Sequence, residues 1–163
     1  NAFCAGAAGG GKTTILKQLR ILHQDKFEES ELRQHKRVIH ANIVKMAAEI
    51  LEYLLQHNQE LSKVSAAGCI DIFKKVDYNR SEFVINPDLA TLLLALRADT
   101  VFRHCYMQTA ELSFMVSTKY YFENLDRICA PEYTPNDQDI LRNRVSTTGV
   151  VELRLTIQGR PFR

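Results

Sequence analysis

Several features that often reveal a function are scarce or missing in this chain. The formal net charge is only +2, and both signs of charge are interspersed along the sequence, so no nucleic-acid surface is indicated. No apolar run approaches the roughly 18–20 residues that span a bilayer. No internal repeat or low-complexity segment stands out. Because hydrophobic residues make up 45% of the sequence, we expect a folded globular protein.

Patterns for metal binding and disulfide formation are also missing. The cysteines form no C-x-x-C pair and have no histidine at ligand spacing. They are Cys4, Cys69, Cys105 and Cys129. Scattered cysteines of this kind predict reduced thiols and a cytosolic setting. The histidines lack an H-E-x-x-H pattern, and we interpret each as a surface or core residue.

Helical periodicity dominates the chain. Residues 13–23 predict one helix, and a break is expected near residues 25–27. A long helical stretch over residues 35–57 carries an apolar stripe. The stripe consists of Ile39, Ile43, Met46, Ile50 and Leu54. We expect an interruption at "VSAAG" (64–68) and further helices over 100–112 and 118–128.

Capping signals and strand patterns add detail at several points. Asn86 and Pro87 predict a helix start, with Asn86 as the cap. The stretch "TPND" predicts another, with Thr134 as the cap, Pro135 at the first position and Asp137 closing a capping box. Alternation over residues 151–157 predicts a half-buried strand that ends at 158–159, and residues 2–5 resemble the end of a buried strand.

A glycine-rich stretch near the start has the pattern G-x-x-x-x-G-K-[ST]. It reads "GAAGGGKT" from Gly6 to Thr13. Glycines let successive backbone N–H groups turn toward an anion, and a following helix adds its positive end. Lys12 is then expected to reach the β- and γ-phosphates of a nucleotide, and the Thr13 hydroxyl to bind Mg²⁺. The alternative is a plain glycine turn between a strand and a helix.

Two stretches resemble heterotrimeric G-protein alpha subunits. "GAAGGGKTTILKQLRILH" is similar to their P-loop and first helix, and "YTPNDQDILRNRVSTTGVVE" to their last helical-domain helix, second linker and switch I. More than a hundred residues separate the two stretches, which resembles the family's helical insertion. Weaker similarity in "ALRADTVFRHCY" and "KYYFENLDRI" extends the resemblance over nearly the whole chain.

The resemblance implies a mostly α fold with a partial α/β part. It combines an incomplete Ras-like P-loop NTPase lobe with a large all-helical insertion domain. Residues 1–26 are expected to hold the P-loop strand, loop and first helix, residues 27–142 the helical domain, and residues 143–163 switch I and the following strand. We expect the helical block to form its own lobe, because its apolar stripes need one another for burial.

The resemblance also implies a site for GTP or GDP with Mg²⁺. Arg144 matches the arginine that the family places in cis at the γ-phosphate, and Thr147 matches the switch I threonine that binds Mg²⁺. Nucleotide contacts are implied for Gly6, Ala7, Ala8, Gly9, Gly10, Gly11, Lys12, Thr13, Thr14, Leu141, Arg142, Arg144 and Thr147. The metal ligands implied are Thr13 and Thr147. Taken without the resemblance, Arg144 is an ordinary exposed arginine and Thr147 a turn residue.

The function implied is that of a GTPase that switches between GTP and GDP downstream of a G-protein-coupled receptor. The implied partners are a beta-gamma dimer, the receptor, and effectors and regulators of GTP hydrolysis, with no nucleic acid. The implied location is cytoplasmic, at the cytosolic face of the plasma membrane.

Some positions depart from the family pattern. Ala8 replaces a glycine near the γ-phosphate, which predicts slower hydrolysis. Gly9 replaces an acidic residue that pairs with the switch arginine, which predicts faster nucleotide exit, and Val116 replaces an aspartate that faces the nucleotide.

The motifs D-x-x-G-Q, N-K-x-D and T-C-A-T do not occur in the sequence. We therefore expect either a fragment or a shortened product that does not select guanine on its own. The alternative function is a helical protein-interaction module with a vestigial P-loop. An unrelated P-loop ATPase is disfavoured by "RVSTTG" after a long helical insertion.

Overall fold

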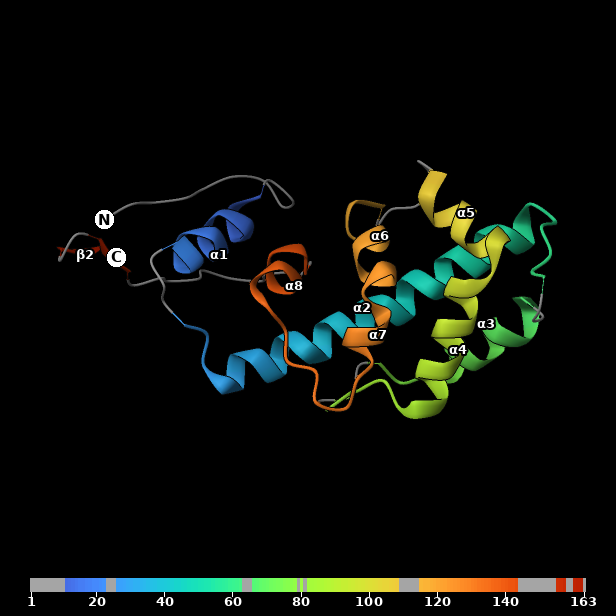
Figure 1. Ribbon diagram of the computed structural model, residues 1–163, viewed down its shortest axis with the longest axis horizontal. Helices are drawn as coiled ribbons and strands as arrows, with labels where there is room; N and C mark the ends of the chain where they lie inside the picture. Colours follow the sequence, from blue (N-terminus) through green and yellow to red (C-terminus); the bar gives the residue numbers. More distant parts are fainter. Residues whose placement is uncertain are drawn as a thin grey trace.

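The computed structural model describes residues 11–22, 26–62, 66–78, 80, 82–108, 115–143, 155–157 and 160–162. These residues are mostly helical (Figure 1). The helices are α1 (Lys12–Leu22), α2 (Glu29–Gln56), α3 (Ala66–Lys75), α4 (Pro87–Ala98), α5 (Thr100–Gln108), α6 (Met115–Glu123), α7 (Leu125–Ile128) and α8 (Asp137–Arg142). Among the described helices, none is both long and apolar enough to cross a membrane.

Helices α2 to α8 are called the helical part below, and α2 is the long helix that runs along it (Figure 1). The predicted stripe from Ile39 to Leu54 is confirmed, because all of its members are buried. Helices α3, α5 and α6 pack against α2, and α4 packs against α5 and α7. Fully burying one such aliphatic side chain stabilises a fold by roughly 1.5–3 kcal/mol, so the stripe accounts for much of the driving force for this packing.

The core between α5 and α6 is aromatic. Phe102 and Tyr106 on α5 both meet Phe122 on α6, with ring centroids 5.4 and 5.2 Å apart. Phe102 and Phe122 have no exposed surface, and Tyr106 is buried. Rings at this spacing add to the energy of burial through edge-to-face and offset contacts. The helical part therefore has a packed core of its own.

The ends of α2 follow local signals. Its first turn holds Glu29 and Glu31, where negative charge favours the helix, and the backbone N–H of Glu28 donates to the Glu31 carboxylate at 2.9 Å. At the other end Asn58 has a φ of 53°, and the N–H of Gln59 donates to the Leu54 carbonyl at 2.9 Å. A left-handed residue after the last turn is a common way to end a helix.

Three sequence-based expectations about the helices were wrong in detail. The interruption predicted at 64–68 lies earlier, because α2 ends at Gln56 and Ala66–Gly68 is already helical. The helix predicted over 118–128 is divided at Asn124, whose side-chain amide donates to the Tyr120 carbonyl at 2.8 Å. Such a local hydrogen bond competes with the regular helical pattern.

The start of α8 is the third correction. Asn136 caps the helix, since its Oδ1 accepts from the N–H of Asp139 at 2.9 Å. The Asp139 carboxylate accepts in return from the N–H of Asn136 at 3.0 Å. The capping box is therefore Asn136 with Asp139, two residues later than the predicted box of Thr134 with Asp137. By contrast, the cap predicted at Asn86 is confirmed, since its side chain accepts from Leu89 N at 2.8 Å.

The β structure that is described is a small hairpin. Strand β1 (Leu155–Ile157) pairs antiparallel with β2 (Arg160–Phe162), with Leu155 opposite Phe162. Strand β1 corresponds to the end of the predicted strand, whereas the sequence did not predict β2. Residues 2–5 and 151–154, also predicted as strand, lie outside the described residues.

Candidate site at the junction of α1 and α8

A glycine in a left-handed conformation directly precedes α1. Gly11 has a φ of +77°, a left-handed conformation in which glycine is favoured. A Cβ atom built there would meet nothing within 4 Å, so the backbone conformation, and not crowding, favours glycine. Helix α1 begins at the next residue, Lys12, and the N–H of Ile15 donates to the Gly11 carbonyl at 3.0 Å. The first N–H groups of such a helix have no partner within it, and they favour anions.

Part of the predicted site lies in the described residues. Gly11 and Thr14 are exposed, and Lys12 and Thr13 are half-buried in the first turn of α1. Leu141 and Arg142 are half-buried in the last turn of α8. The other predicted site residues lie outside the described residues, and their roles stay predictions. They are Gly6, Ala7, Ala8, Gly9, Gly10, Arg144 and Thr147.

Helix α8 lies beside α1, although more than a hundred residues separate them in sequence (Figure 1). Lys17 takes part in this contact, since its ammonium donates to the carbonyls of Ile140 and Asn143, each at 2.9 Å. The residue is only 9% exposed, and this burial lowers the pKa of Lys17 to about 8. A cation at the last carbonyls of a helix also complements the negative end of its dipole.

Asn143 is the polar residue that completes the junction. It is 3% exposed, and its Oδ1 accepts from Asn42 Nδ2 at 3.0 Å. Its own Nδ2 donates to Nδ1 of His35 at 3.4 Å. Burial, together with the nearby charge of Lys17, lowers the pKa of His35 to about 4, so the ring is a neutral acceptor at pH 7. Asn143 therefore joins the end of α8 to α2.

A second link joins α1 to the start of α2. The guanidinium of Arg20 donates to both carboxylate oxygens of Glu31, at 2.7 and 3.1 Å, and stacks over Phe27 at 4.4 Å from the ring centroid. This hydrogen-bonded pair holds the pKa of Glu31 below its usual range. Helix α1 is thus held against the helical part at two points, one turn apart.

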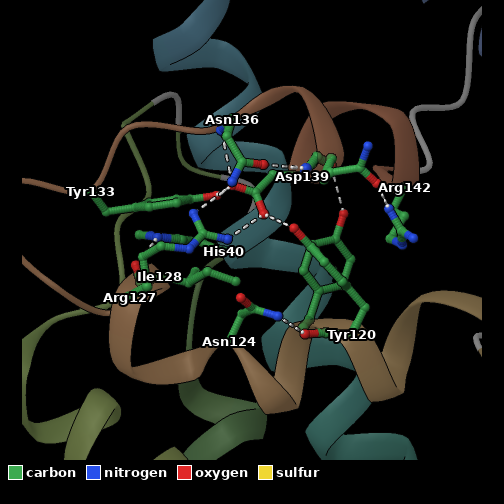
Figure 2. A network of polar contacts seen from close by, with 11 residues as sticks. His40, Tyr120, Asn124, Arg127, Ile128, Tyr133, Asn136, Asp139 and Arg142 are labelled. Atoms are coloured by element: carbon green, nitrogen blue, oxygen red, sulfur yellow. Dashed lines mark hydrogen bonds and ion pairs between the residues drawn. The ribbon is translucent and has the colours of Figure 1, made fainter. Parts of the chain in front are cut away.

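The orientation of α8 is fixed by a buried carboxylate (Figure 2). Asp139 has no exposed surface and accepts two hydrogen bonds from Arg127, both at 2.8 Å. The phenols of Tyr120 and Tyr133 donate to the same carboxylate at 2.8 and 3.1 Å. Burial alone would raise the pKa of Asp139, but the hydrogen bonds from Arg127, the Asn136 amide and Tyr120 hold it below its usual range.

Arg142 is held on the surface of this network. Its guanidinium stacks over the Tyr120 ring, 4.4 Å from the centroid, and donates to Gln138. Its backbone carbonyl accepts from the hydroxyl of Ser117 at 3.0 Å. Sequence reasoning selected Arg142 as a nucleotide contact, and the contacts described for its side chain are with α6 and α8.

Sequence reasoning missed Lys17, Asn143 and Asp139. Lys17 belongs to no motif in the sequence of its helix. Asn143 lies between Arg142 and Arg144, and the family pattern selects these two arginines but not Asn143. The spacing of Asn136 and Asp139 is the one local signal that pointed to this region, because it matches a capping box, but the sequence analysis assigned the box two residues earlier.

Within the described residues, no group of three or more His, Cys, Asp or Glu side chains could hold a metal. The predicted metal ligands are threonines, and only Thr13 is described.

Comparison with known proteins identifies relatives over nearly the full sequence. Residues 1–163 match the family described as "G-protein alpha subunit". The chain is 34% identical over 159 residues to the "Guanine nucleotide-binding protein alpha-7 subunit" of Caenorhabditis elegans, a match that covers 97% of this chain and 45% of the relative. The protein of the same name in Caenorhabditis briggsae matches with the same identity and coverage. The chain therefore spans less than half the length of these relatives and belongs to the G-protein alpha subunit family.

Proposed function

We propose that this chain forms part of a guanine-nucleotide-binding alpha subunit of a heterotrimeric G protein. The observation that carries the proposal is the left-handed Gly11 directly before α1, which places Lys12 and Thr13 in the first turn of a helix whose side is held against α8. Such a helix start supplies N–H groups, a dipole and a cation for phosphate. The family match over the whole chain supports the same reading.

The proposed ligand is a triphosphate with its metal ion. A Cβ at Gly11 would meet nothing within 4 Å, so the backbone there is open to a ligand, and the ammonium of Lys12 would bind phosphate oxygens that the helix start attracts. The hydroxyls of Thr13 and Thr147 are proposed to hold Mg²⁺, with the remaining loop residues from Gly6 to Gly10 and Thr14 cradling the phosphates. Mg²⁺ would neutralise charge on the phosphate oxygens.

The chemistry proposed is hydrolysis of GTP to GDP and phosphate. Arg144 would place its guanidinium at the γ-phosphate and stabilise the charge that develops there. Leu141 and Arg142 would cover the nucleotide from the end of α8. Within this proposal, residues 1–26 and 143–163 form an incomplete Ras-like lobe, and residues 27–142 form the inserted helical domain.

The proposed cellular role is that of a switch downstream of a G-protein-coupled receptor. Its partners would be a beta-gamma dimer, the receptor, and effectors and regulators of GTP hydrolysis. The proposed location is the cytosolic face of the plasma membrane. These parts of the proposal rest on the family, and no described residue carries them.

A binding titration tests the proposal. Fluorescent GTPγS and ATPγS are titrated against the chain with Mg²⁺ and with EDTA, beside Lys12→Ala and the control Lys75→Ala, which changes an exposed lysine on α3. We expect Mg²⁺-dependent GTPγS binding that Lys12→Ala removes and Lys75→Ala retains, and the ATPγS arm reports selection of the base. The absence of binding by a chain with an intact helical circular dichroism signal would favour the alternative, a protein-interaction module.

A further inference from the structure

The burial of Lys17 on α1 is unusual, because burying its charge costs hydration free energy and the fold does not need a charge at this place. An ammonium group loses its hydration when it is buried, and an apolar side chain of similar length is often equally stable in such a place. Lys17 nevertheless lies 9% exposed between α1 and α8, and its ammonium donates to two backbone carbonyls. By donating to these two carbonyls, Lys17 holds the backbone of residues 140–143 in place beside α1.

The carbonyls that Lys17 contacts bracket the proposed nucleotide-facing residues. Ile140 and Asn143 stand on either side of Leu141 and Arg142, and Asn143 directly precedes Arg144. Along α1, Lys17 lies five residues after Lys12, which corresponds to about 7.5 Å of helix. One short helix therefore carries the proposed phosphate contact at its start and the attachment of α8 just beyond it.

We propose that Lys17 is a positioning residue that holds the end of α8 over α1 and thereby slows the release of bound nucleotide. The inference rests on the proposed function, because it needs a nucleotide at the start of α1. Lys17 itself does not touch the nucleotide in this scheme. Its role is to hold residues 140–143 against α1.

The hydrogen bonds from Lys17 to the end of α8 should depend on pH. His35 on α2 interacts electrostatically with Lys17 and also with Arg20 and Glu31. On α8, Asp139 and Arg142 are the charged residues next in sequence to Ile140 and Asn143, whose carbonyls accept from Lys17. The pKa values of His35, Glu31 and Asp139 are all lowered, so His35 is neutral and both carboxylates are charged above pH 6. Lys17, with its pKa lowered to about 8, is then the member of this group that titrates between pH 7 and 9. Its neutral form would donate weaker hydrogen bonds to the two carbonyls.

The test measures dissociation of fluorescent GTPγS from the wild-type chain, Lys17→Met, Lys17→Arg and the control Lys75→Met. Methionine fills a similar volume without charge, and arginine keeps its charge at every pH used. We expect release from Lys17→Met to be about tenfold faster or more at pH 7, because a charge-assisted hydrogen-bond pair is lost. Wild-type release should accelerate several-fold from pH 7 to 9, and release from Lys17→Arg should not.

Hydrogen exchange distinguishes a local loss of the Lys17 hydrogen bonds from a general loss of structure. In Lys17→Met the N–H of Asn143, which donates to Ile140, should exchange faster, whereas amides in the middle of α2 should be unchanged. Wild-type binding combined with unchanged release from Lys17→Met would overturn the inference and leave the proposed function standing. A wild-type chain that binds no GTPγS would instead contradict the proposed function. If Lys17→Met does not fold, a Lys17→Arg variant that keeps the pH dependence overturns the inference.

Discussion

The carboxylate of Asp139 and the guanidinium of Arg127 form a paired, two-point contact inside the helical part, with both hydrogen bonds at 2.8 Å. Asp139 has no exposed surface, while the side chain of Arg127 is 38% exposed. The contact joins α8 to the end of α7, so the helix that carries Leu141 and Arg142 is anchored by a buried charge. Two tyrosine hydroxyls and a backbone amide complete the shell around that charge.

Removing the charge of Asp139 should be strongly destabilising. In Asp139→Asn, the side chain keeps its volume but can no longer satisfy Arg127, both phenols and the Asn136 amide together. Breaking one side of a buried ion pair costs about 3–5 kcal/mol, and the partial exposure of Arg127 places the expectation near the lower value. Urea unfolding measures the loss. Asp137→Asn, an exposed change on the same helix, is the control, and an equal loss in both variants would contradict the account.

Stability should fall as the solution becomes acidic because of His40. The N–H of Ile85 donates to Nδ1 of His40 at 3.0 Å, so the Nε2–H donates to the Ile128 carbonyl at 3.1 Å, and the buried ring is neutral. Burial lowers the pKa of His40 to about 4 from an ordinary value of 6.5. Between these values the unfolded chain binds the proton and the folded chain does not, so stability is present above pH 6.5 and is lost toward pH 4.

The contribution of His40 can be isolated by comparing variants. Linkage gives a loss of about 2 kcal/mol between pH 7 and pH 4.5 from this residue. His35 adds a loss of the same sign, since its pKa is also lowered to about 4. We expect His40→Gln to be less stable at pH 7 and to lose less on acidification, as measured by urea unfolding at both pH values. The exposed His104→Gln should keep the full wild-type loss, and a full loss in His40→Gln as well would refute the assignment.

Two adjacent leucines test the central role of α2. Leu54 is fully buried in the apolar stripe, whereas Leu55 is 43% exposed. Leu54→Ala should cost about 3 kcal/mol, because it removes buried methyl groups and leaves a cavity. Leu55→Ala should cost less than about 1 kcal/mol. Thermal and urea unfolding give both values, and equal costs would mean that the stripe does not form the core.

The proposed catalytic role of Arg144 is tested by single-turnover hydrolysis of GTP. Arg144→Ala should slow hydrolysis by about a thousandfold or more, since a guanidinium at the γ-phosphate contributes on that scale. The affinity for GTPγS should change little, which separates catalysis from binding. Arg33→Ala, an exposed change on α2, is the control. Hydrolysis that proceeds equally well in Arg144→Ala would remove Arg144 from the mechanism.

The sequence predicted the features that depend on local spacing. The stripe of α2 was readable because its members recur at helical intervals, and the cap at Asn86 was readable because proline follows it. Such signals need no knowledge of partners distant in the chain. The family resemblance came from motif residues of the same kind, and the match over the whole chain agrees with it.

The errors and omissions involve contacts between distant residues. Nothing near Lys17 in sequence indicates that its ammonium meets carbonyls at Ile140 and Asn143. The capping box of α8 was placed too early because Thr134 and Asp137 also fit the pattern, whereas Asp139 is the residue that meets Arg127. The sequence alone does not distinguish the two possible capping boxes. The tertiary contact of Asp139 with Arg127 favours the one that forms.

A crystal structure of the chain with GTPγS and Mg²⁺ would test the proposed nucleotide site. We expect the phosphates at the start of α1, against the N–H groups that follow Gly11 and the ammonium of Lys12. We also expect the hydroxyls of Thr13 and Thr147 on the same metal ion. Nucleotide bound elsewhere, or the two hydroxyls too far apart to share one ion, would contradict it.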